Sequence, residues 1–242
     1  MRLATTVATL LSMFVVGCTS PSDRLVMKEW ARGDDAPSLQ HSPSENRTNQ
    51  TLDPGTRTLL SSYGGTIREI SREYGLDWRL VLAVMKQESR FFAEAESHRG
   101  AQGLMQIMPS TGEEVGKHLE IENVVEPLNN IRAGVYYLKK LYSMFEGVPE
   151  EDRIRLTLAA YNAGIGRIYD AQELAAYLND NPRLWPSVRD ALPLLSKRYY
   201  TLHKNVWPQE KPRTGWFGNS RQTLAYVDHV MNYYDEYRLV LN

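Results

Sequence analysis

The chain has 242 residues, of which 42% are hydrophobic and 24% are charged, a balance typical of a globular protein with a buried core. The net charge of -1 excludes the broad basic surface on which nucleic-acid-binding proteins depend. The single cysteine excludes an intrachain disulfide and a cysteine-based metal site. The histidines show no metal-ligand spacing and no nucleotide-binding fingerprint occurs, so we expect no metal and no cofactor.

Residues 1–17 carry one positive charge followed by a short apolar run, which is typical of a secretory signal peptide. The run ends in Val15-Val16-Gly17-Cys18, which resembles the bacterial lipobox, where the cysteine is acylated, with palmitate among the acyl chains, and becomes the first mature residue. We therefore predict lipid attachment at Cys18; an ordinary cleaved signal with an incidental cysteine is the alternative. Thr19 follows, and by resemblance to enterobacterial sorting it favours the outer membrane.

Residues 18–56 are rich in Ser, Pro, Asp, Asn and Thr, and they are predicted to form a disordered tether. From about residue 57 to 242 the apolar residues recur at helical spacing. We expect helices over about 57–74 with Gly75 as cap, from Asp77 through Met85, after Asn130 as far as Phe145, over 150–163 up to Gly164, around 170–179 and 186–204, and from about Ser220. Strand-like alternation is almost absent, so the predicted fold class is a single mostly α domain.

Glu88 lies four residues after Val84 and three after Met85, which places its carboxylate on the apolar face of the second helix. Burial disfavours the ionised form and raises the pKa, so such a carboxyl can hold a proton near neutral pH. A general acid that protonates a leaving sugar oxygen needs this state. Taken alone, the position also fits a helix-end glutamate that turns to solvent or pairs with Lys86 or Arg90.

Three motifs occur in order along the chain. They are Gln87-Glu88-Ser89 with Gly103-Leu104-Met105-Gln106-Ile107-Met108-Pro109 after it, then Ala160-Tyr161-Asn162-Ala163-Gly164, and finally Tyr226-Val227. Together they resemble the soluble-lytic-transglycosylase-like family over about residues 67–237. The stretch 170–196 looks closer to the catalytic domain of the membrane-bound F-type enzymes. Those enzymes usually carry a solute-binding-protein-like domain ahead of the catalytic one, and here we expect the tether in its place.

The resemblance implies a lysozyme-like (goose-type) α-helical domain with a glycan-binding groove, and a peptidoglycan lytic transglycosylase. Glu88 would protonate the oxygen between MurNAc and GlcNAc and then take the proton of the MurNAc C6 hydroxyl, which gives a 1,6-anhydro end without water. The N-acetyl group of the substrate would assist in place of a second carboxylate. The implied substrate-binding residues are Ser97, Gly103, Met105, Gln106, Met108, Tyr161, Asn162 and Tyr226, whose hydroxyl is expected to hydrogen-bond Glu88.

Some residues depart from the family pattern or fall outside it. Gln222 stands where the family often has Glu before the last tyrosine, so the charge near Tyr226 differs. Glu94 and Glu96 are the nearest candidates for a second carboxylate, and we interpret them as surface charges. The segment Trp207 to Phe217 is expected either to pack onto the domain or to form a flap over the groove, with Trp216 stacking on a sugar.

Two other functions fit the same residues. A lysozyme-type hydrolase of the same bond would leave reducing ends, and a non-catalytic lipoprotein would bind glycan without cutting it. The expected partners are peptidoglycan strands and, through lipidated Cys18, a membrane; no nucleic acid is expected. We predict a monomer in the bacterial cell envelope, at the periplasmic face of the outer membrane.

Overall fold

The structure, a computed structural model, describes residues 52–241. The predicted signal peptide, Cys18 and the tether up to residue 51 lie outside the described residues. The elements, in chain order, are α2 (Pro54–Glu73), α3 (Trp78–Ser89), α4 (Pro109–Leu119), α5 (Pro127–Ser143), α6 (Glu150–Ala163), α7 (Ile165–Tyr177), α8 (Trp185–Ala191), η1 (Leu192–Leu195), η2 (Lys197–Tyr199), α9 (Tyr200–Val206) and α10 (Ser220–Val240). Within 52–241 there is no strand, and two isolated antiparallel bridges join Gln102 to Glu96 and to Ile107.

The helix boundaries follow local capping chemistry. Asp53 accepts a hydrogen bond from the Thr56 amide and Pro54 occupies the first turn of α2, so this helix begins slightly before the predicted residue 57. Gly75 ends the same helix at a φ of 62°, as expected of a C-terminal glycine. Asp77 caps α3 by accepting from the Arg79 amide, as predicted.

Several elements differ from the expectation. Helix α7 begins at Ile165 and not near residue 170, and the stretch 186–204 is divided among α8, η1, η2 and α9. Helix α4 was not predicted, because its two glycines and few apolar residues give a weak helical pattern. Helix α5 begins at Pro127 and not after Asn130, since Glu126 acts as the N-cap and the proline fills the first turn. Phe145 lies beyond the end of this helix, although it remains buried.

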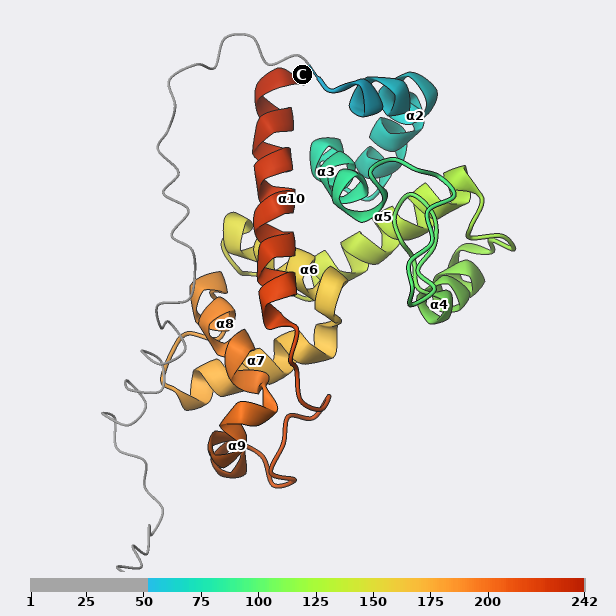
Figure 1. Ribbon diagram of the computed structural model, residues 1–242. Helices are drawn as coiled ribbons and strands as arrows, with labels where there is room; N and C mark the ends of the chain where they lie inside the picture. Colours follow the sequence, from blue (N-terminus) through green and yellow to red (C-terminus); the bar gives the residue numbers. More distant parts are fainter. Residues whose placement is uncertain (1–51, 242) are drawn as a thin grey trace, which may run out of the picture. The chain divides into compact units, whose positions relative to one another are not determined.

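Helix α10 is the central contact of the domain, and its largest interface is with α3 (Figure 1). It also packs on α6, which in turn contacts α5 and α7. The residues of α3 from Leu80 to Met85 are buried, and so are Val227, Val230 and Tyr237 of α10. Helix α2 also contacts α3, so the first and last described helices, α2 and α10, both pack on the helix that carries Glu88.

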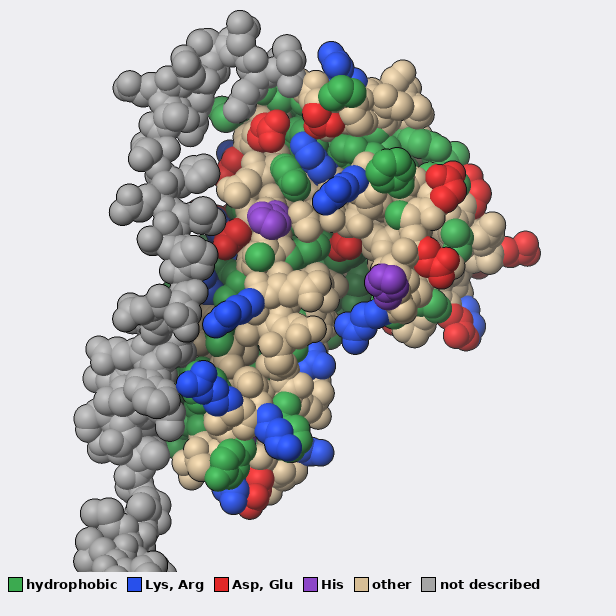
Figure 2. Space-filling model, viewed as in Figure 1, with side chains coloured by type: hydrophobic (Ala, Val, Ile, Leu, Met, Phe, Trp, Pro, Cys, Tyr) green, Lys and Arg blue, Asp and Glu red, His purple; other side chains and the backbone are tan. Residues whose placement is uncertain are grey.

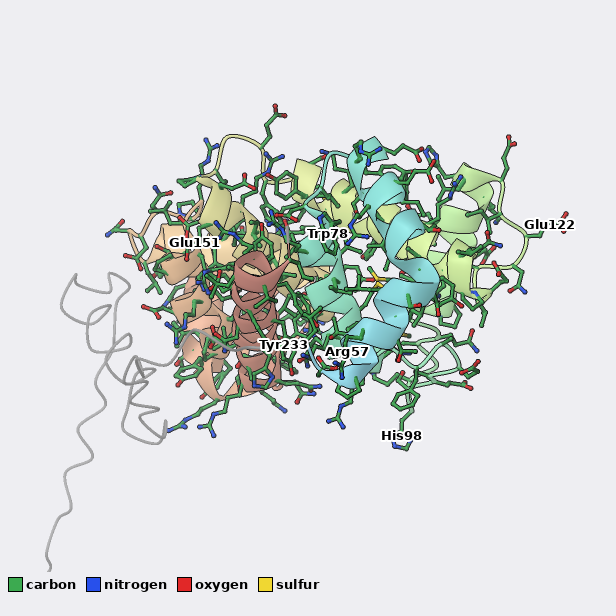
Figure 3. All side chains as sticks on the ribbon, turned by 90° about the horizontal axis from the view of Figure 1, so that it is seen from above. Arg57, Trp78, His98, Glu122, Glu151 and Tyr233 are labelled. Carbon is green, nitrogen blue, oxygen red and sulfur yellow. The ribbon has the colours of Figure 1, made fainter. Side chains whose placement is uncertain are left out.

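Lys86 closes the contact between the start of α2 and the end of α10. Its ammonium group forms an ion pair with Asp53 at 3.0 Å and lies over the ring of Tyr233 at 4.5 Å. Tyr233 projects from α10 and Arg57 from α2 in the view from above (Figure 3). Thr56 and Tyr237 share a buried hydrogen bond of 2.9 Å beside this pair. Lys86 is thus occupied, which leaves it unavailable as a partner for Glu88.

No helix within residues 52–241 is long and apolar enough to cross a membrane.

Asn130 connects α5 to the loop before α4 and to the segment just before α5. This side chain is 1% exposed; its carbonyl accepts from the Met105 amide at 2.8 Å, and its amide donates to the Gln102 and Val124 carbonyls, both at 3.1 Å. An unpartnered buried amide or carbonyl costs free energy, so all three bonds stabilise the fold. The loop between α3 and α4 is therefore held to α5 by one side chain.

We expect Asn130→Ala to lower the free energy of unfolding by about 2–3 kcal/mol, because it leaves the buried Met105 amide and the half-buried Val124 carbonyl without partners and removes one of the two hydrogen bonds to the Gln102 carbonyl. Asn129→Ala is the matched control: Asn129 makes one exposed side-chain hydrogen bond, to the Asn123 carbonyl, and its loss should cost under about 1 kcal/mol. Urea unfolding followed by circular dichroism measures both. Equal costs for the two variants would contradict the role assigned to Asn130.

Candidate active site

Glu88 lies on the last turn of α3, facing α10. The Tyr226 hydroxyl, from the second turn of α10, donates a hydrogen bond of 2.6 Å to Glu88 Oε1. Burial raises the pKa of Glu88 from 4.5 to about 7, and the Tyr226 hydrogen bond, which favours the ionised form, opposes this rise. Neither influence comes from a second carboxylate. Near neutral pH the group is therefore poised between its acid and base forms.

The chain turns sharply just after Glu88. Arg90 and Phe91 both have left-handed backbone conformations, with φ of 51° and 71°, although neither is glycine. The Ser89 hydroxyl donates to the Met85 carbonyl and accepts from the Phe91 amide, which stabilises this conformation. Strained residues of this kind persist where the surroundings fix them, and here they end α3 directly after the half-buried Glu88.

The loop before α4 carries much of the first motif, and its side chains hold the loop itself. Gly103 has a φ of 79°, and a Cβ added there would lie 2.5 Å from the Asn130 side chain, so only glycine fits. The Gln106 amide donates to the carbonyls of Ala95 and Gly103 at 2.9 and 3.0 Å. The Met105 side chain is fully buried against Gly134, so it offers no surface to a sugar; its backbone carbonyl remains as a polar group.

Tyr161 connects this loop to the second motif. Its hydroxyl donates to the Met105 carbonyl at 2.8 Å, and its ring lies 5.5 Å from that of Tyr137. The pKa of Tyr161 is raised well above 10, mainly by burial and to a smaller extent by the nearby charge of Glu88. The hydroxyl therefore stays protonated beside Glu88, and it braces the loop rather than bonding to the carboxyl.

The second and third motifs meet through Asn162. The Thr223 hydroxyl donates to Asn162 Oδ1 at 2.9 Å, one turn of α10 before Tyr226. Asn162 is exposed, so its amide side chain also borders solvent at the end of α6. Gln222 is exposed on the first turn of α10, one residue before Thr223. This hydrogen bond ties the end of α6 to the helix that supplies Tyr226.

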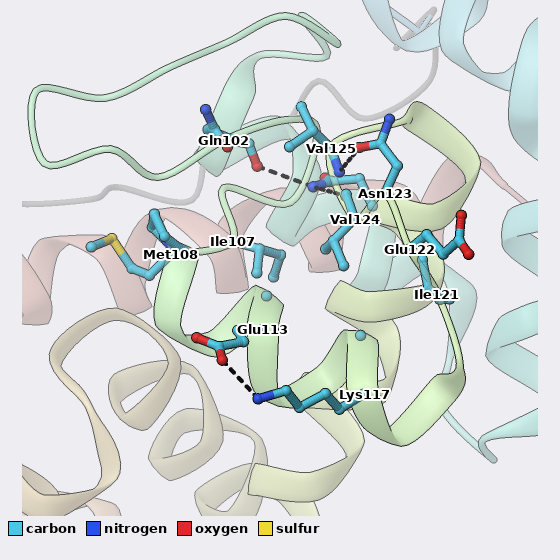
Figure 4. A pocket seen from close by; sticks show the side chains of 14 residues that line it. Gln102, Ile107, Met108, Glu113, Lys117, Ile121, Glu122, Asn123, Val124 and Val125 are labelled. Carbon is cyan, nitrogen blue, oxygen red and sulfur yellow. Dashed lines mark hydrogen bonds and ion pairs between the residues drawn. The ribbon is translucent and has the colours of Figure 1, made fainter.

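Ser97 and Met108 lie at the edges of the same loop. The Ser97 hydroxyl accepts from the Ala101 amide at 2.9 Å, and the Met108 side chain is 40% exposed. Met108 also lines a cavity of about 390 Å³ between α4 and the loop that follows it (Figure 4). Ile107, Gly112, Val124 and Asn130 line this cavity as well, whereas Glu88 does not. The cavity is therefore separate from the candidate acid.

The segment Trp207 to Phe217 packs onto the domain, which was one of the two expectations for it. The buried Asp170 carboxylate accepts from the amides of Arg213 and Thr214 at 3.0 and 2.9 Å. Glu173 accepts from Trp207 Nε1 at 2.8 Å and pairs with Arg213 at 3.0 Å. Asp170 was missed from the sequence, because a single acid inside a helix gives no sign of the loop it will hold.

Other titratable groups lie away from Glu88. Glu94 and Glu96 are exposed, as expected of surface charges. His98 projects outward from its loop (Figure 3), and it is exposed. Among residues 52–241 no group of three or more His, Cys, Asp and Glu side chains could hold a metal ion.

The site can donate a proton and take one up at a single group, the Glu88 carboxyl. A carboxyl with a pKa of about 7 can act as an acid in one step and as a base in the next. Tyr226 and Tyr161 fix the surroundings of that carboxyl from α10 and α6. In Figure 2 the surface is indented between the region of α4 and the region of α7 to α9.

Known proteins resemble this chain in sequence. Residues 65–183 match the family described as "Transglycosylase SLT domain". A membrane-bound lytic murein transglycosylase F of Desulfosudis oleivorans is 34% identical over 180 residues, covering 74% of this chain and 37% of that protein. The enzyme of the same name from Pseudoalteromonas translucida is 38% identical over 184 residues, covering 75% and 34%. The chain thus spans about a third of the length of these relatives.

Solved structures share the fold. The 70 kDa soluble lytic transglycosylase SLT70 of Escherichia coli superposes with a TM-score of 0.51 at 24% identity, covering 73% of this chain and 24% of that one. A complex of the 70 kDa soluble lytic transglycosylase with bulgecin A gives the same score and identity over 75% and 25%. The prediction of a mostly α, lysozyme-like domain is confirmed. Through residues 65–183, the chain belongs to the transglycosylase SLT family.

Proposed function

We propose that this chain is a peptidoglycan lytic transglycosylase with Glu88 as its acid and base. The observation that carries the proposal is the half-buried Glu88 carboxyl, with a pKa of about 7 and a hydrogen bond from Tyr226, inside a transglycosylase SLT domain. Relatives named lytic murein transglycosylases support the same substrate.

The reaction needs two proton transfers at one carboxyl. Protonated Glu88 donates to the glycosidic oxygen between MurNAc and GlcNAc as the bond from C1 to that oxygen breaks. Ionised Glu88 then accepts the proton of the MurNAc C6 hydroxyl as its oxygen bonds to C1. The product carries a 1,6-anhydro ring, no water is consumed, and Glu88 returns to its protonated form.

A single carboxyl suits this reaction better than hydrolysis. Most glycoside hydrolases place a second carboxylate about 5–10 Å from the first, to act as nucleophile or to activate water. Glu94 and Glu96 are exposed, and no carboxylate contributes to the pKa of Glu88. The N-acetyl group of the substrate takes the place of the second carboxylate in the proposed mechanism.

Several residues of the motifs contact other parts of the protein and so support the reaction by fixing the shape of the site. Gly103, Gln106 and the Met105 backbone shape the loop opposite Tyr161. Ser97, Met108 and Asn162 retain accessible surface, and we assign them contacts with the sugars. Tyr226 holds Glu88 directly.

We also place the enzyme in the cell envelope, as a monomer. Lipid attachment at Cys18 would hold it at the periplasmic face of the outer membrane, and the tether would let the domain reach the glycan. Membrane-bound relatives support an envelope location, and the lipobox-like sequence supports the anchor.

Incubation with peptidoglycan should release muropeptides with 1,6-anhydroMurNAc ends, about 18 Da lighter than hydrolytic products, as measured by mass spectrometry. Glu88→Gln should lower the rate about 10²–10⁴-fold, because glutamine keeps the size and cannot donate the acid proton. Reducing ends lost in the variant would make the protein a hydrolase. An absence of products from both proteins would favour a binding role.

The stability of Glu88→Gln at two pH values shows whether the variant is folded and whether the pKa of Glu88 is raised. Since a pKa difference of one corresponds to about 1.4 kcal/mol, ionising Glu88 at a pKa of about 7 instead of 4.5 costs the folded state about 3 kcal/mol. This cost is absent below pH 4.5, grows between the two pKa values and is complete above pH 7. The variant should therefore be more stable than the parent at pH 8 and equally stable at pH 4.

The rate should fall as pH rises through about 7, because Glu88 loses the proton that it must donate. Tyr226→Phe removes the hydrogen bond that favours the ionised form, so this fall should move to higher pH. Tyr234→Phe is the matched control: it lies on the same helix, but its hydroxyl bonds Asp77 at 3.0 Å. A pH profile of Tyr226→Phe identical to that of the parent would show that the Tyr226 hydrogen bond does not lower the pKa of Glu88.

A further inference from the structure

The hydroxyl of Thr223 is buried near the start of α10, and its hydrogen bond leads to another helix. Thr223 is 2% exposed, and its Oγ1 donates to Asn162 Oδ1 at 2.9 Å, across 61 residues of sequence. A threonine inside a helix can instead return this bond to its own helix, as Thr157 of α6 does with the Arg153 carbonyl at 2.8 Å. Thr223 therefore holds a side chain that belongs to α6.

Asn162 is fixed in its backbone, but its side chain is exposed. It is the penultimate residue of α6, and Gly164, with a φ of 88°, ends this helix and leads directly into α7. A carboxamide presents an acceptor oxygen on one side and an NH2 donor on the other, so its orientation decides what it offers a ligand. Because Oδ1 is bound to Thr223, the NH2 group of Asn162 points away from that hydroxyl.

The contact lies next to the candidate acid. Helices α6 and α10 pack on each other (Figure 1), and Tyr161, the neighbour of Asn162, lies close enough to Glu88 for the charge of that carboxyl to raise the pKa of its hydroxyl. Thr223 and Tyr226 share one face of α10, about 4.5 Å apart along the helix axis. Tyr226 in turn donates to Glu88 at 2.6 Å. A donor on Asn162 thus borders the place where a sugar bound at Glu88 would lie.

We propose that Thr223 is a positioning residue: by holding Asn162 Oδ1, it turns the Asn162 NH2 group toward an oxygen of the sugar bound at Glu88. This inference rests on the proposed function, because it concerns a glycan held at Glu88. The carbonyl of an N-acetyl group accepts hydrogen bonds without donating any, so it is the sugar oxygen that an NH2 group matches best. A donor that is oriented before the ligand arrives loses less conformational freedom on binding than one that rotates.

This role concerns binding of the glycan and not the proton transfer. Thr223 acts through Asn162, which bonds the sugar before and during the reaction alike. The loss of an interaction of this kind raises KM and leaves kcat unchanged. A displacement of α10 that moved Tyr226 would instead change kcat and the pH profile, because Tyr226 bonds the carboxyl that exchanges the proton.

The test uses the full chain in detergent with soluble, uncrosslinked glycan strands. Calorimetry gives the Kd in a Glu88→Gln background, which keeps the strands uncut, and counting of anhydro ends gives kcat and KM with Glu88 present. Thr223→Val keeps the shape of the side chain and removes the hydroxyl, Thr223→Ser keeps the hydroxyl, and Asn162→Ala removes the amide. Thr157→Val is the matched control, since it removes a buried hydroxyl whose bond stays within α6.

Thr223→Val should raise Kd and KM about two- to ten-fold, as expected when one side chain must be ordered during binding. Its kcat should change less than two-fold and its pH profile should match that of the parent. Thr223→Ser and Thr157→Val should stay within two-fold of the parent in all quantities. Asn162→Ala should raise Kd at least as much, and Thr223→Val added to it should have no further effect, because the two residues act as one unit.

Other outcomes separate this inference from the proposed function. An unchanged Kd in Asn162→Ala, an exposed position where a substitution does not threaten folding, or additive losses in the double variant, would overturn the positioning role and leave the transglycosylase in place. A lower kcat with a shifted pH profile in Thr223→Val would overturn it too, since Thr223 would then act through Tyr226. An absence of anhydro ends from every protein that retains Glu88 would refute the function on which this inference rests.

Discussion

The burial of one carboxyl between α3 and α10 is the constraint on which the rest of the site depends. The residues of α3 from Leu80 to Met85 are buried, and Glu88 at its end is half-buried, so its carboxyl is largely removed from solvent but keeps an accessible part. The hydrogen bond from Tyr226 then compensates part of the cost of charge. Burial alone would favour the neutral acid strongly, and the tyrosine brings the carboxyl back toward the pH at which it can exchange its proton.

The loop that faces this carboxyl owes its shape to tertiary contacts. Asn130 holds it from α5, and Tyr161 holds it from α6 through the Met105 carbonyl. Gly103 and Gln106 occupy left-handed conformations within it, which suit a loop that is fixed at several points. Much of the family motif therefore maintains a backbone shape, while a few exposed residues are left to contact a ligand.

The regions on either side of the site differ in charge. The region of α4 is acidic, and the region of α9 and the segment after it is basic. Asp170 and Glu173 of α7 hold that basic segment in place, so its cations and Trp216 are presented on a fixed support. Charges on a fixed support lose less conformational freedom on binding a ligand than charges on a mobile loop do.

The sequence by itself determined the α class, the start of α3, the extent of α6 and the place of Glu88 on the inner face of α3, because capping residues and apolar spacing are local signals. It also predicted the partnership of Tyr226 with Glu88, though through family resemblance. Only the tertiary structure showed the features that local sequence patterns do not encode. These are the weak helix α4, the early start of α5, and the contacts of Asn130 and Asp170. Those two side chains each hold segments more than twenty residues away, and such contacts exist only after the chain has folded.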